Sequence, residues 1–245
     1  MNETIEHLLA HTSVRNFADT PLTSSQKASL IAAAQAASSS NFLQAYSILE
    51  ITDKAKRHEL GRLANCEAYV ATTGVFYVFV ADLYRHATIL KKKNQSLDPL
   101  RSPESLLVAT VDTSLAAQNM VVAAESMGLG ICYIGGIRND LSKVAELLEL
   151  PEMTVPLFGL TIGVPKTKNE PKPRIPAETI TAQDRYDASI LTNLDRYDQL
   201  IASYYQHRTS NQQQSTWSDK SLAYFAFDRR PQVKTFLQQQ GFQLK

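Results

Sequence analysis

Hydrophobic residues in the first third of the chain recur at spacings that change from helical to strand-like. Strong helix formers run through QKASLIAAAQAA, residues 26 to 37, behind the N-cap candidates Thr23 and Ser24. β-branched and aromatic residues fill YSILEIT, residues 46 to 52, and GVFYVFVAD, residues 74 to 82, which predicts two strands. The stretch between them, TDKAKRHELGRL, has a helical pattern, so we expect the order strand, helix, strand.

A third helix is predicted over residues 104 to 127, where the apolar positions leave scarcely a polar face. A helix that is apolar nearly all round must be buried, either at the centre of a domain or between subunits. We favour a seam between two subunits. Gly128 and Gly130 follow directly and are typical of a helix C-terminus. The apolar positions are Leu106, Leu107, Val108, Val111, Leu115, Ala116, Met120, Val121, Val122 and Met127.

The rest of the chain predicts two more strands and then a polar tail. ICYIGG, residues 131 to 136, and PLFGLTIGVP, residues 156 to 165, are strand patterns closed by glycine and by proline. From Thr181 to His207 a helical pattern carries several tyrosines, and polar residues then precede Trp217 and an amphipathic segment ending in KTFLQQQGF. This tail has few large apolar residues. We therefore expect a core of residues 1–180 and a helical extension of residues 181–245 that wraps the core or a partner subunit.

Composition and charge argue against several kinds of partner. Lys and Arg number 25 against 24 Asp and Glu, and a net charge of +1 attracts neither nucleic acid nor an anionic membrane. The apolar run GVFYVFVA is too short to span a bilayer, and no signal-peptide pattern opens the chain, so we expect a cytoplasmic protein. Cys66 and Cys132 form no C-x-x-C pair and the histidines lack metal-ligand spacing, which predicts two buried thiols and no metal site.

The stretch HTSVRNF, residues 11 to 17, places three polar groups on alternate residues near the start of the chain. In an extended segment His11, Ser13 and Arg15 point to one face. An imidazole, a hydroxyl and a guanidinium on one face suit an anion. A polar surface loop after a helix has the same composition, so this stretch alone does not decide between the two.

A second stretch, SSSNFLQ, runs from Ser38 to Gln44 at the expected end of a helix. Hydroxyls and an amide in succession can fix a polar ligand, while Phe42 and Leu43 can cover an apolar one. A serine-rich helix stop explains the same residues without a ligand.

Two further stretches offer a phosphate clamp and a close backbone approach. Pro173 holds Lys172 and Arg174 in extended backbone, which puts two cations on one side, although a solvated loop is the simpler alternative. In YIGGIRN, residues 133 to 139, Gly135 and Gly136 let backbone amides approach a flat ligand. The spacing matches neither a dinucleotide-binding nor a P-loop motif, and a tight turn explains the glycines equally well.

Together these stretches resemble the NADPH-dependent nitroreductase and flavin reductase family. HTSVRNF, SSSNFLQ, YIGGIRN and KPRIP occur in the family's order, followed by WSD at 217 to 219 and RRP at 229 to 231. The likeness covers nearly the whole chain and is greatest to the oxygen-insensitive major nitroreductases. It implies an α+β fold, a mixed and mainly antiparallel sheet flanked by helices, in an intertwined homodimer with FMN at each of two sites in the subunit interface.

The resemblance also implies which residues form the site. His11, Ser13 and Arg15 match the residues that hold the ribityl phosphate and nearby atoms of FMN, and Lys172 and Arg174 would meet it from the other side. The other implied FMN contacts are Ser39, Ser40 and Asn41 along the flavin, Tyr133, Ile134, Gly135 and Gly136 under its ring, and Glu67 at the pyrimidine edge. The residues implied at the substrate or NADPH are Phe42, Arg138, Arg208 and Arg230.

The chemistry that the resemblance implies needs no acid or base from the protein. NADPH or NADH gives a hydride to FMN and leaves, and a nitroaromatic, a quinone or free flavin then takes two electrons, which predicts ping-pong kinetics. Arg15 or Lys172 is the candidate cation beside the flavin atoms that gain negative charge. Two alternatives stay open, namely a flavin-binding or flavin-delivery protein without significant turnover and a non-redox binder of phosphate ligands.

At two places the chain departs from the family's pattern. Relatives usually carry glutamine where this chain has Glu67, and an ionised glutamate only accepts hydrogen bonds, so either the carboxyl is protonated or the flavin potential drops. Relatives also place basic residues beyond Arg208 to hold the 2′-phosphate of NADPH, whereas residues 211 to 214 here are NQQQ. Arg138 and Arg230 are candidates for the missing charge, or plain surface residues. The preference for NADPH over NADH is therefore open.

Overall fold

The computed structural model describes residues 2–189, 194–208 and 212–244. The chain forms two compact units. The first comprises Met1–Asn169 and Arg230–Lys245, and the second comprises Glu170–Arg229. Part of the tail therefore returns to the first unit.

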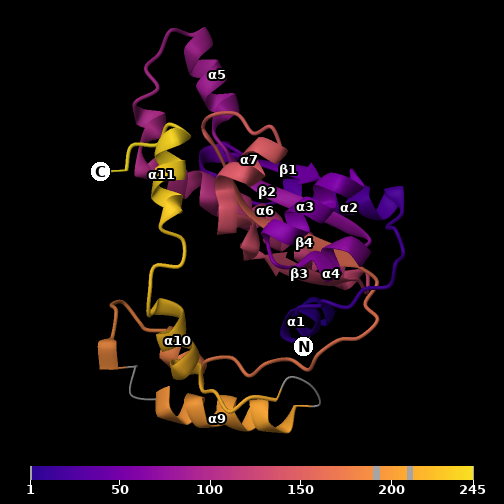
Figure 1. Ribbon diagram of the computed structural model, residues 1–245. Coiled ribbons are helices and arrows are strands. Elements are labelled where there is room, and N and C mark those ends of the chain that lie inside the picture. Colours follow the sequence, from indigo (N-terminus) through magenta and orange to yellow (C-terminus); the bar gives the residue numbers. More distant parts are fainter. Residues whose placement is uncertain (1, 190–193, 209–211, 245) are drawn as a thin grey trace. The chain divides into compact units, whose positions relative to one another are not determined.

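A four-stranded antiparallel sheet is the centre of the first unit (Figure 1). Its order is β1-β2-β4-β3, and the strands are β1 (Tyr46–Glu50), β2 (Val75–Asp82), β3 (Gly130–Ile134) and β4 (Thr154–Gly163). All three strand pairs are antiparallel, and one isolated parallel bridge joins Ser13 to Ile131. The predicted α+β class with a mainly antiparallel sheet is confirmed, and each of the four strands was expected from its apolar pattern.

Helices cover both faces of this sheet. Every residue of β2 is buried, which is what its unbroken apolar run predicts for a central strand. On one face Tyr77 and Phe79 pack in the cluster that contains the apolar residues of α2 and α6. On the other, Phe76, Val78 and Val80 pack with residues of α3, α4 and α7. These helices are α2 (Ser24–Gln35), α3 (Lys54–Leu63), α4 (Glu67–Thr72), α6 (Pro103–Ser126) and α7 (Leu141–Leu147).

The caps that the sequence predicted are present. Thr23 is the N-cap of α2, where its side chain accepts from the backbone N–H of Gln26 in a capping box. Gly128 follows α6 with φ of +74°, a left-handed conformation that glycine adopts without strain. Between β1 and β2 the structure has two helices, α3 and α4, where the sequence analysis expected one.

The long helix α6 is buried on one side only. Its small residues pack under the sheet, while Leu107, Val111 and Leu115 are 61%, 53% and 42% exposed. These three lie four residues apart and form one stripe. By length and composition α6 could cross a membrane, but the packing of its alanine-rich face in the core already accounts for its apolar character.

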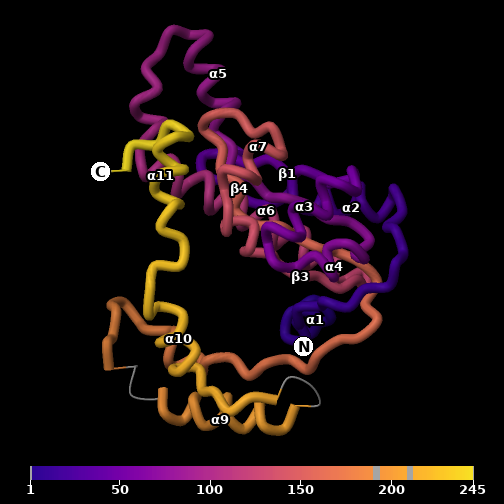
Figure 2. Tube along the Cα trace, in the orientation of Figure 1, coloured from indigo at the N-terminus to yellow at the C-terminus, as the bar shows by residue number. Residues whose placement is uncertain are grey.

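A smaller apolar cluster closes one end of the sheet. Here α11 (Gln232–Gln239) returns to the first unit, and Figure 2 shows it lying beside α7. Phe236 packs with Leu141, Ala145 and Met153 in this cluster, which also contains Ala87 of α5 (Tyr84–Lys92). The first element, α1 (Glu3–Leu9), has no buried residue and contacts α6. Short 3₁₀ helices of the first unit include Ser40–Phe42, Pro99–Arg101 and Gly135–Asp140.

The second unit consists of three helices, α8 (Ala177–Ile180), α9 (Leu194–His207) and α10 (Trp217–Phe225), among its described residues. Tyr197, Ile201 and Tyr205 form its core stripe on α9. The expectation that one helix spans residues 181 to 207 was wrong for residues 181 to 187, which are not helical, and the Asp187 side chain accepts from the backbone N–H of Ser189. Residues 190–193 and Asn211 of the NQQQ stretch lie outside the described residues.

Candidate functional site

The segment of residues 11 to 17 runs beside the edge strand β3. The backbone N–H of Val14 donates to the carbonyl of Ile131 at 2.8 Å, and Val14 is buried against Gly130, where a Cβ would approach it to 2.6 Å. Phe17 is also buried and bridges to Pro165. The apolar side chains therefore fix this segment to the sheet, and Arg15 lies exposed on it.

Two side chains of this segment, His11 and Arg15, interact with other parts of the first unit. The Nδ1 atom of His11 lies 2.6 Å from the Oε1 atom of Glu125, near the end of α6. Burial raises the pKa of Tyr69 to about 12 and also raises the pKa of the Cys132 thiol, and in each case the positive charge of Arg15 acts in the opposite direction. Arg15 therefore lies close enough to β3 and α4 for its charge to act on both groups.

The end of β3 places an aromatic ring and two glycines at this edge. The Tyr133 ring packs edge-on against Phe158 with ring centroids 5.2 Å apart, and its hydroxyl is 3.3 Å from the Oε1 atom of Gln118. Ile134 is buried in the core, so only its backbone can meet a ligand. A Cβ on Gly136 would lie 2.2 Å from the carbonyl oxygen of Ala64, so packing within the protein itself requires this glycine.

The neighbouring Gly135 is less confined. The three atoms nearest to a Cβ there all belong to the guanidinium of Arg138, and the nearest is 3.4 Å away. Arg138 itself donates through Nη1 to the carbonyl of Leu157. Its guanidinium is thus already used to join β4 to the turn after β3.

Glu67 is the first residue of α4 and has an ion-pair partner on α3. Its Oε1 atom lies 2.6 Å from the Nε2 atom of His58. Both side chains are about half exposed, at 49% and 61%. The carboxylate therefore faces the His58 imidazole, which can carry a positive charge. The sequence analysis did not predict this pair.

The SSSNFLQ stretch is held by a residue that the sequence analysis missed. Asp112, fully buried on α6, accepts hydrogen bonds from the backbone N–H groups of Ser40 at 2.8 Å and Ala45 at 3.1 Å. The Ser39 hydroxyl is buried and has no hydrogen-bond partner. Phe42, in contrast, is 82% exposed.

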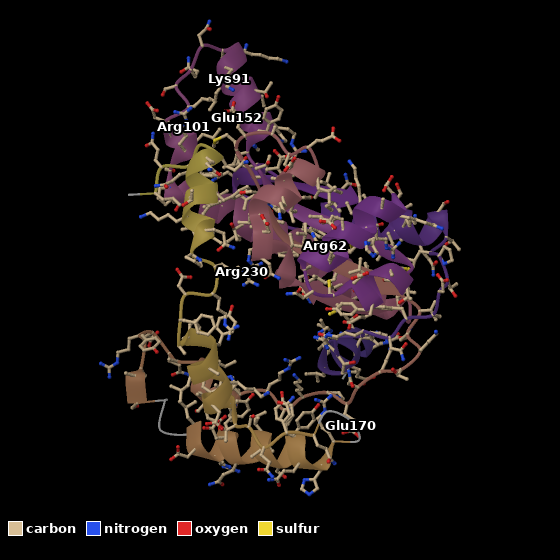
Figure 3. All side chains as sticks on the ribbon, in the orientation of Figure 1. Arg62, Lys91, Arg101, Glu152, Glu170 and Arg230 are labelled. Carbon is tan, nitrogen blue, oxygen red and sulfur yellow. The ribbon has the colours of Figure 1, made fainter. Side chains whose placement is uncertain are left out.

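Arg230 begins the returning part of the tail and is labelled in Figure 3. Its Nη2 and Nε atoms donate to the side-chain oxygen of Asn139 at 2.8 and 3.3 Å. The Asn139 side chain in turn donates to the carbonyl of Leu63 at 3.2 Å. Arg230 therefore lies beside the turn that contains Gly135 and Gly136.

In the second unit, cations surround one tyrosine. The Nζ atoms of Lys220 and Lys172 lie 4.3 and 5.7 Å from the ring centroid of Tyr205, and the Arg208 guanidinium lies 5.7 Å from it. Burial acts to raise the pKa of Tyr205, but hydrogen bonds and charge from Lys172 and Lys220 outweigh it and the pKa is lowered. Arg174 acts in the same lowering sense on Tyr197, whose pKa burial raises. This group of cations suits an anion.

The structure thus brings together part of the predicted site within each unit. His11, Ser13 and Arg15 meet the end of β3, while Lys172, Arg174 and Arg208 share the second unit. The sequence analysis missed Asp112, Glu125 and Lys220. The sequence could have indicated Asp112, because it is a lone acid inside an apolar helix and a buried carboxylate needs hydrogen-bond donors.

Comparisons with known proteins find relatives over almost the whole chain. The family model described as "Nitroreductase family" matches residues 8–164, and that described as "Nitroreductase family, C-terminal domain" matches residues 172–245. The chain is 42% identical to the FMN reductase (NADPH) of Bacillus subtilis over 99% of each chain, and 43% identical to the oxygen-insensitive NADPH nitroreductase of Salmonella typhimurium, also over 99% of each. The solved NADPH:FMN oxidoreductase from Vibrio harveyi complexed with NAD⁺ superimposes with a TM-score of 0.87 at 40% identity, over 98% of this chain and 99% of that one.

Proposed function

Since the chain belongs to the nitroreductase family, we propose that it is an FMN-dependent NAD(P)H oxidoreductase that reduces nitroaromatics, quinones or free flavin. The observation that carries this proposal is the alignment of the His11 to Arg15 segment with β3, which sets a cation and a hydroxyl beside the Tyr133 turn. A cytoplasmic location fits the proposal.

The residues present fit FMN. The buried Ser39 hydroxyl lacks a partner, and a ligand atom would satisfy it. Gly135 leaves its backbone open to a flat ring, since the atoms nearest to the position of a Cβ are those of the Arg138 guanidinium, at 3.4 Å or more. Arg15 adds a cation on the same edge. No cluster of metal-ligating side chains occurs among the described residues.

The chain's own residues would bind and tune the cofactor. When bound, FMN supplies a two-electron centre that accepts a hydride from NAD(P)H and passes electrons to an oxidant. Arg15 or Lys172 would stabilise the negative charge that reduction adds to the pyrimidine edge, and His11, which Glu125 orients, would hold the phosphate end. Lys172 and Arg174 would meet the phosphate. The exposed Phe42 ring offers a surface for the flat substrate.

Purified protein tests this function directly. We expect yellow protein whose flavin absorbance is bleached by NADPH without oxygen and restored by a nitroaromatic or a quinone. Yellow protein that NADPH and NADH both fail to bleach would favour the flavin-delivery alternative. Colourless protein that does not bind added FMN would exclude both.

We propose that each flavin site is shared between two subunits. His11 is anchored to α6 at Glu125, and the Ser39 to Asn41 segment is anchored to the same helix at Asp112. These anchors are thirteen residues apart, which is about 20 Å along a helix that rises about 1.5 Å per residue. A flavin ring is shorter than this separation, which supports the proposal that the loop over a given flavin comes from the partner subunit.

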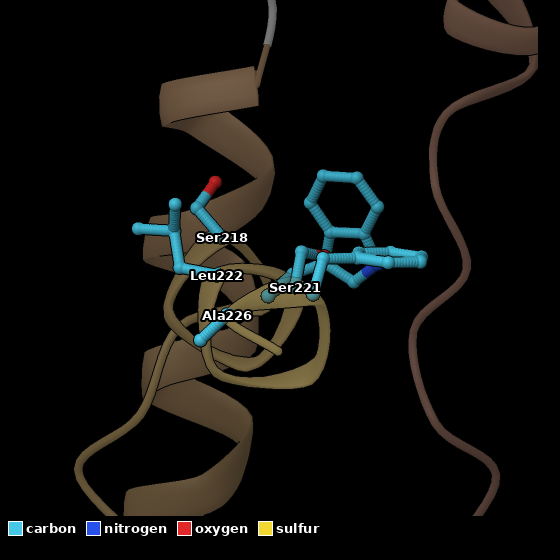
Figure 4. Close-up of a pocket in the computed structure, with 6 residues that line it drawn as sticks. Ser218, Ser221, Leu222 and Ala226 are labelled. Carbon is cyan, nitrogen blue, oxygen red and sulfur yellow. The ribbon is translucent and has the colours of Figure 1, made fainter. Parts of the chain in front are cut away.

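Two exposed apolar surfaces need a covering partner, and the first supports the proposed intertwined homodimer. One is the stripe of Leu107, Val111 and Leu115 on α6. The other is on α10, where Leu222 and Phe225 are 72% and 80% exposed around an open depression of about 660 Å³ (Figure 4). We propose that a second copy covers α6 and that α10 covers the core or the partner subunit. The depression is lined by Trp217, Ser218, Ser221, Leu222, Phe225 and Ala226.

We expect Lys220 to replace the cation missing from the NQQQ stretch. Its Nζ atom donates to Gln213 of that stretch at 2.7 Å and lies over the same tyrosine ring as Arg208. Lys220→Ala should lower kcat/KM for NADPH by about tenfold or more and leave NADH nearly unchanged, because only NADPH carries the 2′-phosphate. Lys234→Ala, which removes an exposed charge on α11, is the control for net charge. Equal losses with both nucleotides would contradict the assignment.

Glu67→Gln should raise the midpoint potential of the bound flavin. Glutamine removes a negative charge from the pyrimidine edge and adds a donor. We expect a shift on the order of 30 mV in a redox titration, which is about tenfold in the equilibrium of a two-electron couple. His58→Gln is the matched control, because it changes the partner of Glu67 and keeps the carboxylate, so the potential should not rise. An unchanged potential in Glu67→Gln would contradict the expected place of Glu67.

A further inference from the structure

Asp112 is a fully buried acid within the apolar side of α6. One carboxylate oxygen accepts from the backbone N–H of Ser40 and the other accepts from the backbone N–H of Ala45. A carboxylate is tolerated without water only where donors replace the lost hydration. These two bonds hold both ends of the loop of residues 40 to 45, more than sixty residues away in the sequence.

The loop between these two bonds has an unfavourable backbone. Asn41, Phe42 and Gln44 have φ values of +47°, +59° and +52°. Asparagine tolerates the left-handed region, but a bulky aromatic residue such as phenylalanine rarely adopts it. Contacts from elsewhere must therefore impose this shape. Asp112 supplies them at the two ends, and Arg85 and His86 contact the carbonyls of Gln44 and Leu43 at 3.2 and 3.1 Å.

The loop carries groups that the proposed function uses. Ser39, Ser40 and Asn41 would line the flavin, and Phe42 would meet the substrate. The Phe42 ring is 82% exposed and its own contacts do not fix it. Its position therefore depends on the backbone beneath it, and that backbone depends on Asp112.

We propose that Asp112 is a positioning residue for the oxidant: by clamping residues 40 and 45 it holds Phe42 in the left-handed conformation that presents its ring to the substrate. This role rests on the proposed function. It gives a fully buried residue of α6 a part in substrate binding.

Asp112→Asn tests the role, because the amide can accept at one oxygen but places a donor opposite the second N–H. We expect KM for a nitroaromatic oxidant to rise about tenfold with kcat within about twofold, since a displaced binding group costs binding. In a Phe42→Ala background the same substitution should change KM by less than about twofold, because the two residues act through one contact. If Asp112→Asn acted only by a general structural defect, its effect on KM would remain in the Phe42→Ala background.

A second pair of variants tests the hydrogen bond between Asp112 and the loop from the side of the loop. Ser40→Pro removes the N–H that Asp112 accepts, and Ser39 already has the extended backbone, φ −138° and ψ 153°, that a residue before proline prefers. Ser40→Ala removes the hydroxyl alone and keeps the N–H. We expect the rise in KM with Ser40→Pro and a smaller one with Ser40→Ala. This comparison tests the positioning role of Asp112 even if Asp112→Asn fails to fold.

Thr113→Val is the control on the helix. Thr113 is as buried as Asp112, but its hydroxyl donates to Ala109 within α6 and not to the loop, so KM should not change. If Asp112→Asn and Ser40→Pro lower Tm and leave KM at the wild-type value, the positioning role is overturned. A wild-type protein that neither binds nor reduces FMN would overturn the proposed function and this role together.

Discussion

Co-expressing Arg15→Glu and Asn41→Asp subunits should restore activity that neither variant has alone. If each flavin lies between Arg15 of one subunit and Asn41 of the other, a mixed dimer has one doubly altered site and one intact site. Random pairing makes about half of the dimers mixed, so about a quarter of the wild-type activity returns. Each variant alone should retain about a few per cent of the wild-type activity, since a misplaced negative charge opposes the reduced flavin.

Both substitutions suit this experiment because both side chains are exposed. Aspartate also tolerates the positive φ of residue 41 nearly as well as asparagine does, so the loop should keep its shape. Different affinity tags on the two chains allow mixed dimers to be purified and their FMN content to be counted, with one flavin expected per dimer. Mixed dimers without activity or flavin would show that one chain builds the whole site. The distance between the two anchors on α6 argues against that outcome.

The strands and long helices could be predicted because their signals are local. The run GVFYVFVA is apolar without a break, and β2 is accordingly buried along its full length. Thr23 precedes strong helix formers and caps α2. The prediction of a helix from Thr181 was wrong because helix formers occur there without apolar residues at helical spacing. The core of α9 uses Tyr197, Ile201 and Tyr205, each four residues apart, and the helix starts at Leu194.

The site was predictable only where its residues lie on one short segment. Alternation in HTSVRNF placed His11, Ser13 and Arg15, and the structure adds that Val14 and Phe17 hold this segment to the sheet. The partners of these groups come from distant parts of the chain. Glu125 is more than a hundred residues from His11, and Asp112 is seventy-two from Ser40. Periodicity and spacing carry no information about such pairs, which only the folded chain brings together.

Gly136→Ala should be the most destabilising single substitution at the site. The added Cβ would lie 2.2 Å from the Ala64 carbonyl oxygen and 2.9 Å from its Cα, so backbone rather than a flexible side chain would have to move. Overpacking of this kind costs about 3 kcal/mol. For a domain of this size that lowers Tm by about 10 °C, measurable by calorimetry or circular dichroism. A loss of less than about 2 °C would mean that the turn after β3 shifts at little cost.

Gly135→Ala is the matched variant, and it separates two reasons for adjacent glycines. Its Cβ would lie 3.4 Å from the guanidinium of Arg138, an ordinary van der Waals contact, so Tm should stay within about 2 °C of the wild-type value. The dissociation constant for FMN should rise about tenfold, because the methyl group enters the space that a flat ring needs over the backbone. Gly136 would then be required by the protein and Gly135 by the cofactor. Unchanged FMN affinity in Gly135→Ala would instead move the flavin away from this turn.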